Sequence, residues 1–279
     1  MTNNFKQLED KFYKLIKDTD KIIYPLIESI EIDDISKHNS AYRNYSNDKF
    51  KNFVEVEKRR FIKVLNVITE DKCHGKICDL GCFIPYVPMA LSLLGYQVQI
   101  VDKYELYGSR FKHSILKLAE THSIEVNDMD ILQDEFTNLA KNDIVLLMAV
   151  VEHLSGSPEN LMNKVQQIIS PNGFIIFEVP NIAEFAKRIK MMLGNSPLPP
   201  YETYFHSDYP FTGHNREMTV AEVIYLMDKT GFEIEWLHCY DYSKYLPKTW
   251  LGKSIRVIKK LIPIRDKGES IMVKAYFRQ

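Results

Sequence analysis

The sequence is poor in cysteine and lacks a long uninterrupted apolar run. Four cysteines in a chain of 279 residues are too few for a disulfide framework. The longest apolar run is residues 144–151, whereas a membrane-spanning helix needs about twenty apolar residues. The first ten residues are polar and acidic and do not resemble a signal peptide. We therefore predict a soluble, cytoplasmic protein.

Three of the cysteines lie close to His74 in the sequence, and cysteine together with histidine is a possible zinc-binding set. Cys73, Cys78 and Cys82 are separated by four and by three residues, whereas structural zinc sites use pairs of cysteines two residues apart. The pair Glu152–His153 also offers two ligand types, but the sequence supplies no matched further ligand. We predict no metal site.

The net charge gives little signal for the whole chain, because 36 basic residues balance 37 acidic ones. This balance argues against binding of duplex nucleic acid. Residues 248–267 nevertheless carry a net charge of +6, while residues 1–247 carry −8. Apolar residues recur in 248–267 at roughly helical intervals, which predicts a basic amphipathic helix. Such a helix either contacts the inner face of a membrane peripherally or packs its apolar side on the domain.

Beyond residue 75, short apolar segments alternate with amphipathic ones. Strands are expected at 76–80, 96–101, 124–126, 143–148, 173–179, 232–239 and 270–277, and helices at 87–94, 111–121, 158–169 and 220–230. This alternation predicts an α/β fold with a doubly wound, Rossmann-like parallel sheet. Ligands of such sheets bind beyond the carboxyl ends of the strands.

Two segments fall outside this alternation. Residues 1–50 form a predicted N-terminal helical extension, with an interruption at Pro25, before a further helix at 52–69 within the main domain, 51–279. Residues 183–218 separate the fifth strand from the next helix and are rich in proline and aromatic residues. So long a connection in a compact domain indicates a lid or a substrate-binding insert.

The first two strands each end at an acidic residue. Asp79 is followed by Gly81, whose lack of a side chain lets a cofactor approach the backbone. Asp102 ends the second strand, where a carboxylate can bind both hydroxyls of a ribose. The alternative is that Asp79 and Asp102 merely form turns at the ends of their strands.

These residues and several further stretches resemble the class I S-adenosylmethionine-dependent methyltransferases, over about residues 50–279. Residues 76–85 are similar to the first motif of that family, and residues 98–103 to the strand that carries the ribose acid. Residues 127–131 resemble the segment that faces adenine. Residues 143–154 end in the Glu-His-Leu signature of small-molecule O-methyltransferases, and residues 169–178 resemble the proline-glycine turn and strand that follow it.

The resemblance implies a seven-stranded sheet whose last strand is antiparallel, and S-adenosylmethionine as the cofactor. It also implies a set of cofactor-binding residues at the ends of the first four strands. These are Asp79, Gly81, Cys82, Phe83, Asp102, Lys103, Asp130, Ile131, Met148 and Ala149.

The chain departs from the family pattern at Phe83 and Pro85, where relatives have further glycines. These bulky residues also exclude a nicotinamide dehydrogenase, whose pyrophosphate needs glycines at the helix N-terminus. The departure leaves open a second class of function, a non-catalytic binding subunit with a methyltransferase fold.

Methyl transfer to an alcohol requires that a base remove the hydroxyl proton. His214, in a polar turn after the insert, is the preferred base, and His153, after the fourth strand, is the second candidate. For His153 the alternative is a structural histidine that is hydrogen-bonded in a turn.

The acceptor is predicted as a small polar molecule. Residues 213–219 resemble bacterial members that methylate sugars and other surface-glycan precursors, so a sugar or a phosphate-like group of such a precursor is the leading interpretation. The predicted substrate-binding residues are Arg216, His206, Tyr204 and Tyr209. For Arg216 the equal alternative is an ion pair with Glu217 or with the region that opens the next helix. For His206 the alternative is a plain surface histidine, and for the tyrosines it is packing of the insert on the core. The alternatives are a quinone, a lipid precursor or an amine, because the fold does not fix the acceptor. No feature of the sequence predicts an oligomeric state.

Overall fold

The computed structural model describes residues 5–71, 75–243, 259, 263 and 265–278. Seven strands form one sheet in the order β3-β2-β1-β4-β5-β7-β6. Their bounds are β1 Lys76–Leu80, β2 Gln97–Asp102, β3 Ile124–Asp128, β4 Asn142–Met148, β5 Ile169–Pro180, β6 Phe232–Tyr240 and β7 Ser270–Phe277.

The strand directions confirm the predicted fold class. Strands β1 to β5 pair in parallel, and β7 is inserted between β5 and β6 and runs antiparallel to both. The carboxyl ends of β1, β2 and β4 therefore meet at one edge of the sheet, which is where such folds bind their ligands.

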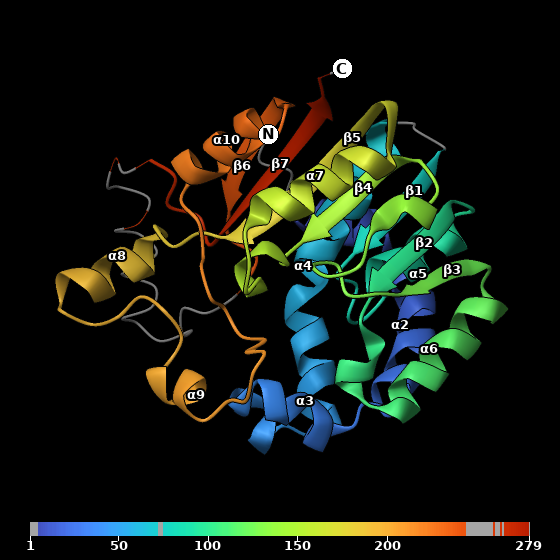
Figure 1. Cartoon of the computed structure of the whole chain (residues 1–279), viewed down its shortest axis with the longest axis horizontal. Coiled ribbons are helices and arrows are strands. Elements are labelled where there is room, and N and C mark those ends of the chain that lie inside the picture. Colours follow the sequence, from blue (N-terminus) through green and yellow to red (C-terminus); the bar gives the residue numbers. More distant parts are fainter. Residues whose placement is uncertain (1–4, 72–74, 244–258, 260–262, 264, 279) are drawn as a thin grey trace.

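Helices cover both faces of the sheet (Figure 1). Alternate residues of the central strands belong to two separate apolar clusters, as expected for strands buried on both faces. One cluster joins the sheet to α2, α4, α5 and α6, and the other joins it to α7 and α10. The helix bounds are α4 Asn47–Asp71, α5 Tyr86–Leu93, α6 Ser109–Thr121, α7 Pro158–Ile168 and α10 Val220–Lys229.

The N-terminal extension packs on the domain rather than standing apart from it. It comprises α1 (Phe5–Lys11), α2 (Tyr13–Ile27), α3 (Ile32–His38) and the 3-10 helix η1 (Ser40–Asn44). The predicted interruption at Pro25 is wrong, because α2 includes this residue and ends two residues later. A proline this close to a helix end removes a single backbone hydrogen bond. The neighbours Ile23, Leu26 and Ile27 are buried and hold the last turn in place.

The segment 183–218 after β5 contains α8 (Phe185–Met192) and α9 (Tyr201–Phe205). Helix α9 is bonded to the N-terminal extension, since the Ser40 hydroxyl donates to the Thr203 carbonyl at 2.8 Å. The Ser40 amide likewise donates to the Ser207 hydroxyl at 2.8 Å. Two segments distant in sequence thus form one side of the molecule (Figure 1).

None of the helices in the described part of the chain is long and apolar enough to cross a membrane. The predicted amphipathic helix in 248–267 lies almost entirely outside the described residues. Only Lys259, Pro263 and residues 265–267 of this segment are described.

Candidate functional site

The loop after β1 is shaped by a single glycine. Gly81 has φ +72°, and a Cβ added to it would lie 2.6 Å from Cγ2 of Val150. Its amide donates to the Val101 carbonyl at 2.8 Å, which joins the loop to β2. Phe83 and Pro85 are not among the residues with left-handed backbone. The loop therefore needs one glycine only, and the departure from the family pattern does not block its turn.

The side chain of Phe83 joins an aromatic cluster beside this loop. Its ring lies 4.4 Å from that of Tyr107 and 5.8 Å from that of Phe111, measured between centroids. Cys82 is buried, and its carbonyl accepts a hydrogen bond from the Tyr104 hydroxyl at 3.0 Å. These aromatic side chains form an apolar surface beside the carboxyl ends of β1 and β2.

Asp102 lies at the end of β2 with its carboxylate almost buried. One oxygen accepts from the Lys103 amide at 2.7 Å. The Tyr107 hydroxyl lies 3.2 and 3.3 Å from the two oxygens. Burial raises the pKa of Asp102 to about 7, although the bonds from Lys103 and Tyr107 oppose this shift. Such a carboxylate fits a ribose, whose two hydroxyls would donate to it without adding charge.

The Tyr107 hydroxyl lies within hydrogen-bond distance of both Asp102 oxygens, which are the acceptors that a ribose diol would use. We expect Tyr107→Phe to bind S-adenosylhomocysteine about two- to tenfold more tightly, since the long hydrogen bond that Tyr107 shares between the two Asp102 oxygens, worth about 0.5–1.5 kcal/mol, no longer competes. Titration calorimetry measures the change. The aromatic contact with Phe83 is kept in this variant, so weaker binding would show that the hydroxyl supports the cofactor instead.

Asp79, at the end of β1, is also buried, and burial raises its pKa to about 7. The folded-state pKa thus lies above the ordinary value of 3.8, so Asp79 opposes folding increasingly as the pH rises towards 7. We expect Asp79→Asn to stabilise the cofactor-free protein, with a gain in unfolding free energy that grows by about 2–3 kcal/mol between pH 5 and pH 8. Urea unfolding at the two pH values measures this, and a gain independent of pH would contradict it.

The remaining predicted cofactor residues follow β2, β3 and β4. Burial opposes ionisation of Asp130, but its bonds from the Leu132 and Gln133 amides and its 3.2 Å ion pair with Lys103 lower its pKa overall. Ala149 follows Met148 at the end of β4 and has φ +54°. The structure thus brings the predicted set to one edge, with Ile131 in the turn after β3.

The two candidate bases lie together, with ring centroids 4.8 Å apart. Nδ1 of His153 is 2.7 Å from the Thr212 carbonyl. Because a carbonyl only accepts, Nδ1 carries the proton and Nε2 has a free lone pair. Burial, and then the neighbouring His214, lower the pKa of His153 to about 4, so it is neutral at physiological pH.

His214 is held by an acidic partner that the sequence did not reveal. Its Nδ1 lies 2.9 Å from Oε1 of Glu217, and Glu217 also pairs with Lys187. Burial acts to raise the pKa of Glu217, but these two partners lower it overall. Glu217 is therefore ionised at neutral pH.

Glu152 adds a third polar group beside the two histidines. It is fully buried, and burial raises its pKa to about 7. Its carboxylate oxygens make no hydrogen bond to any described residue. One ligand atom each of Glu152, His153 and His214 lies within 4.8 Å of the others, which is a group that could hold a divalent cation. The sequence offered no third ligand for such a site, because His214 is brought in by the fold.

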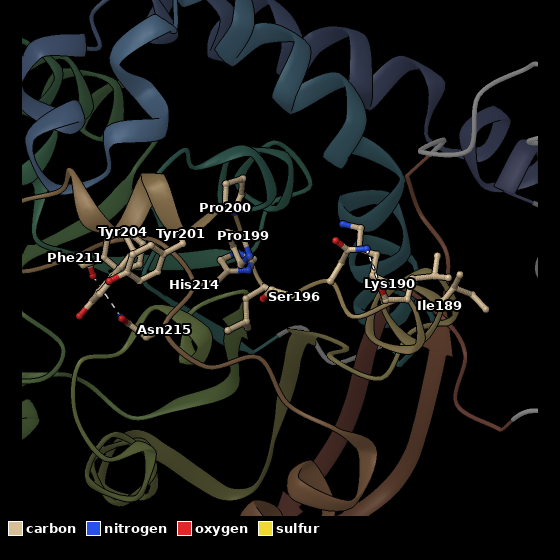
Figure 2. A pocket seen from close by; sticks show the side chains of 13 residues that line it. Ile189, Lys190, Ser196, Pro199, Pro200, Tyr201, Tyr204, Phe211, His214 and Asn215 are labelled. Atoms are coloured by element: carbon tan, nitrogen blue, oxygen red, sulfur yellow. Dashed lines mark hydrogen bonds between the residues drawn. The ribbon is translucent and has the colours of Figure 1, made fainter.

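A cavity of about 840 Å³ opens in front of His214. Figure 2 shows His214 between Ile189 and Lys190 of α8 on one side and the aromatic rings of Tyr201, Tyr204 and Phe211 on the other. The further lining residues are Leu193, Asn195, Ser196, Leu198, Pro199, Pro200 and Asn215. Apolar and aromatic side chains make up most of the lining, and Lys190, Asn195, Ser196, His214 and Asn215 add polar groups.

Of the four predicted substrate-binding residues, only Tyr204 is among the described residues that line this cavity. Arg216 is exposed and pairs with Glu222 at 2.7 Å, next to the start of α10. His206 and Tyr209 are exposed and are not among the residues that line the cavity. The position of Arg216 therefore does not support the prediction that it contacts an anionic group of the substrate.

Sequence reasoning missed a buried charged group beneath the site. Arg60 of α4 lies 2.8 Å from Glu57 and 3.6 Å from Glu178 at the end of β5. Glu178 is fully buried and accepts hydrogen bonds from the hydroxyls of Tyr240 and Ser270. The signal for Glu57 and Arg60 was available, since they stand three residues apart on the otherwise apolar face of α4.

The strand order, the antiparallel last strand and the acids at the ends of β1 and β2 define a class of enzyme, the S-adenosylmethionine-dependent methyltransferases. A family model described as a methyltransferase domain matches residues 50–236, and the chain belongs to this family. S-adenosylmethionine is the cofactor of the class, and Gly81 and Asp102 fit it in geometry and chemistry.

The curated relatives are distant. The chain is 22% identical over 219 residues to a ubiquinone biosynthesis O-methyltransferase of Rickettsia typhi, covering 76% of this chain and 83% of that one. It is 23% identical over 173 residues to the protein of the same name in Rickettsia canadensis, covering 61% and 68%.

Solved structures share the fold at low sequence identity. Magnesium protoporphyrin IX methyltransferase of Synechocystis, solved with S-adenosylhomocysteine, superposes with a TM-score of 0.54 at 14% identity, covering 84% of this chain and 90% of that one. A methyltransferase of Thermotoga maritima gives a TM-score of 0.52 at 12% identity, covering 83% and 95%.

Proposed function

We propose that the chain methylates a hydroxyl group of a small aromatic acceptor held in the cavity in front of His214, which residues 183–218 line (the lid cavity), with His214 as the base. The observation that carries this proposal is the 2.9 Å contact between Nδ1 of His214 and Glu217, beside the cavity. A proton held on Nδ1 by the carboxylate leaves Nε2 free to take the proton of a hydroxyl. His214 was the preferred base on sequence grounds, and that role remains a proposal.

Glu217 and His153 support this base in different ways. Glu217 is ionised and buried, so it stabilises the imidazolium that forms when His214 takes a proton. His153 stays neutral, and its free Nε2 can accept a hydrogen bond from a neighbouring hydroxyl of the acceptor, since the one proton of the reacting hydroxyl passes to His214.

The bound cofactor supplies an already activated methyl group. As the new carbon–oxygen bond forms and the carbon–sulfur bond breaks, the hydroxyl proton passes to Nε2 of His214. The cavity positions the acceptor, and such positioning is worth about 7–11 kcal/mol at best.

The lining of the cavity favours an aromatic acceptor. Tyr201, Tyr204 and Phe211 line the cavity with aromatic rings, which can interact with a planar ring by stacking or edge-to-face contact. The relatives named for ubiquinone biosynthesis agree with a hydroxylated ring of quinone type. A sugar or phosphate-like acceptor stays a weaker prediction, since Arg216 pairs with Glu222 and lies away from the lining residues.

A methyl-transfer screen with labelled cofactor tests the proposal. Catechols and hydroxylated benzoates form one panel, and nucleotide sugars and amines form two others. We expect label in the phenolic panel as an acid-stable, base-stable ether. Transfer confined to the sugar or amine panel would overturn the acceptor class while leaving the enzyme class intact.

A further inference from the structure

Helix α9 forms part of the wall of the lid cavity but has no core of its own. It comprises five residues, and none of them is buried. A helix this short is not stable by itself in water. Tyr201 and Tyr204 of α9 nevertheless line the cavity, and Tyr204 packs on Phe211 with ring centroids 5.2 Å apart. The position of α9 must therefore depend on contacts with another part of the chain.

The N-terminal extension supplies these contacts through η1. The Ser40 hydroxyl donates to the Thr203 carbonyl at 2.8 Å, and the Ser40 amide donates to the Ser207 hydroxyl at 2.8 Å. The Arg43 guanidinium donates to the His206 carbonyl at 2.6 Å. Figure 1 shows α9 beside α3 at the same side of the molecule. Two residues of the extension thus bind α9 and the residues that directly follow it.

The end of α3 is bonded to the segment that leads from α9 to the two histidines of the site. The Lys37 carbonyl accepts from the Asp208 amide at 2.8 Å, and the His38 carbonyl accepts from the Thr212 amide at 2.9 Å. The Thr212 carbonyl in turn lies 2.7 Å from Nδ1 of His153. One residue, Thr212, therefore connects the extension to the histidine pair.

The extension is itself fixed to the domain beside the loop after β1. The ring of Phe50, in the first turn of α4, lies 5.3 Å from that of Tyr42 and 5.9 Å from that of Phe83, measured between centroids. The Arg110 amide of α6 donates to Oε2 of Glu31 at 2.7 Å. Contacts on two sides thus hold the extension in place, so it can serve as a support for α9.

We infer that residues 37–43 position the wall of the acceptor cavity, with Ser40 and Arg43 as positioning residues for the acceptor. The family model begins at residue 50, so these residues precede the part of the chain that matches the methyltransferase domain. The inference rests on the proposed acceptor site, because α9 contributes the aromatic rings that we assign to the acceptor. Loss of the bonds to α9 weakens binding of the acceptor in the ground state and the transition state alike, which raises KM and leaves kcat unchanged.

Kinetics of the double variant Ser40→Ala/Arg43→Ala test the inference, with labelled cofactor and catechol as the first acceptor probe. We expect KM for catechol to rise about three- to thirtyfold, since two or more hydrogen bonds that hold α9 are removed. The value of kcat and the affinity for S-adenosylhomocysteine should stay unchanged, because these bonds end at residues 203–207 and not at the base or the cofactor residues.

Hydrogen exchange gives a second readout, which needs no acceptor. Amides of residues 203–212 should exchange faster in the double variant, whereas those of α8 should exchange as in the unmodified chain. If methyl transfer occurs only to a sugar or an amine, the proposed acceptor class fails, and KM for that acceptor replaces the value for catechol. Unchanged exchange, or faster exchange with an unchanged KM, would overturn the inference and leave the proposed function standing.

A matched control pair comes from the same extension. The Ser36 hydroxyl donates to the Asp33 carbonyl at 3.1 Å, and Lys21 pairs with Asp18 at 2.8 Å, so both bonds stay within their own helices. Lys21→Ala/Ser36→Ala should therefore keep the KM and the exchange of the unmodified chain.

The conservative variant Ser40→Thr/Arg43→Lys keeps a hydroxyl and a cationic donor, so it should bring KM back towards that of the unmodified chain. Thermal unfolding with S-adenosylhomocysteine checks that all variants are folded. A rise in KM of equal size in the control pair, or a fall in kcat without a rise in KM, would show that Ser40 and Arg43 do not position the acceptor site.

Discussion

Replacing His214 with asparagine is expected to lower kcat about 10²–10⁴-fold, the usual contribution of a general base. The asparagine amide is too weak a base to take the proton from the acceptor hydroxyl. It keeps the polar character of the side chain beside Glu217, and His214 is not among the residues assigned to the cofactor. S-adenosylhomocysteine should therefore bind to this variant with unchanged affinity. Single-turnover methyl transfer and calorimetry measure the two quantities separately.

His206 provides the control for this substitution. It belongs to the same segment but is exposed, and its carbonyl, not its ring, is bonded by Arg43 at 2.6 Å. His206→Asn should keep full turnover. Equal losses in the two variants, or normal turnover in His214→Asn with a saturating acceptor, would remove His214 from the role of base. An activity of the unmodified chain that disappears on chelation and returns with a divalent cation would assign His214 to metal binding with Glu152 and His153.

The fold was largely predictable because strands covered on both faces leave a clear pattern. The strands at 76–80 and 270–277 have the predicted bounds, since each is a short, mostly apolar segment between turn residues. Thr219 and Glu222 form a capping box that begins α10 where the sequence predicted a helix. Local signals of this kind do not depend on distant parts of the chain.

The site was less predictable because its contacts join distant residues. His214 meets His153 across 61 positions, and Arg60 meets Glu178 across 118, so no local spacing reveals either pair. For Arg216 the sequence left a substrate contact and an ion pair near the start of the next helix equally open, and the structure shows the ion pair, with Glu222 in the first turn of α10. The residue type predicts which groups a side chain can bind, but the course of the backbone determines which groups lie near it.

Asp102→Asn should weaken S-adenosylhomocysteine binding about 10- to 150-fold, because hydrogen bonds to a charged group contribute about 1.5–3 kcal/mol. Asparagine offers one acceptor oxygen, and its NH₂ group faces a ribose hydroxyl that needs an acceptor. The site is buried, so water cannot replace the lost bond. Calorimetry above pH 8, where Asp102 is ionised, gives the full effect, because its pKa is about 7.

A ligand without the 2′-hydroxyl shows whether the ribose is the group that Asp102 binds. The 2′-deoxy analogue of S-adenosylhomocysteine should bind the unmodified chain more weakly than the parent compound, but should lose much less in Asp102→Asn. The losses in binding free energy from two changes that remove the same interaction do not add, whereas the losses from changes at independent points do. Additive losses would mean that Asp102 only supports the turn through Lys103 and Tyr107. Tyr107→Phe is expected to change the affinity for S-adenosylhomocysteine in the opposite direction through the same carboxylate. Tighter binding to Tyr107→Phe and weaker binding to Asp102→Asn would together locate the ribose at the end of β2.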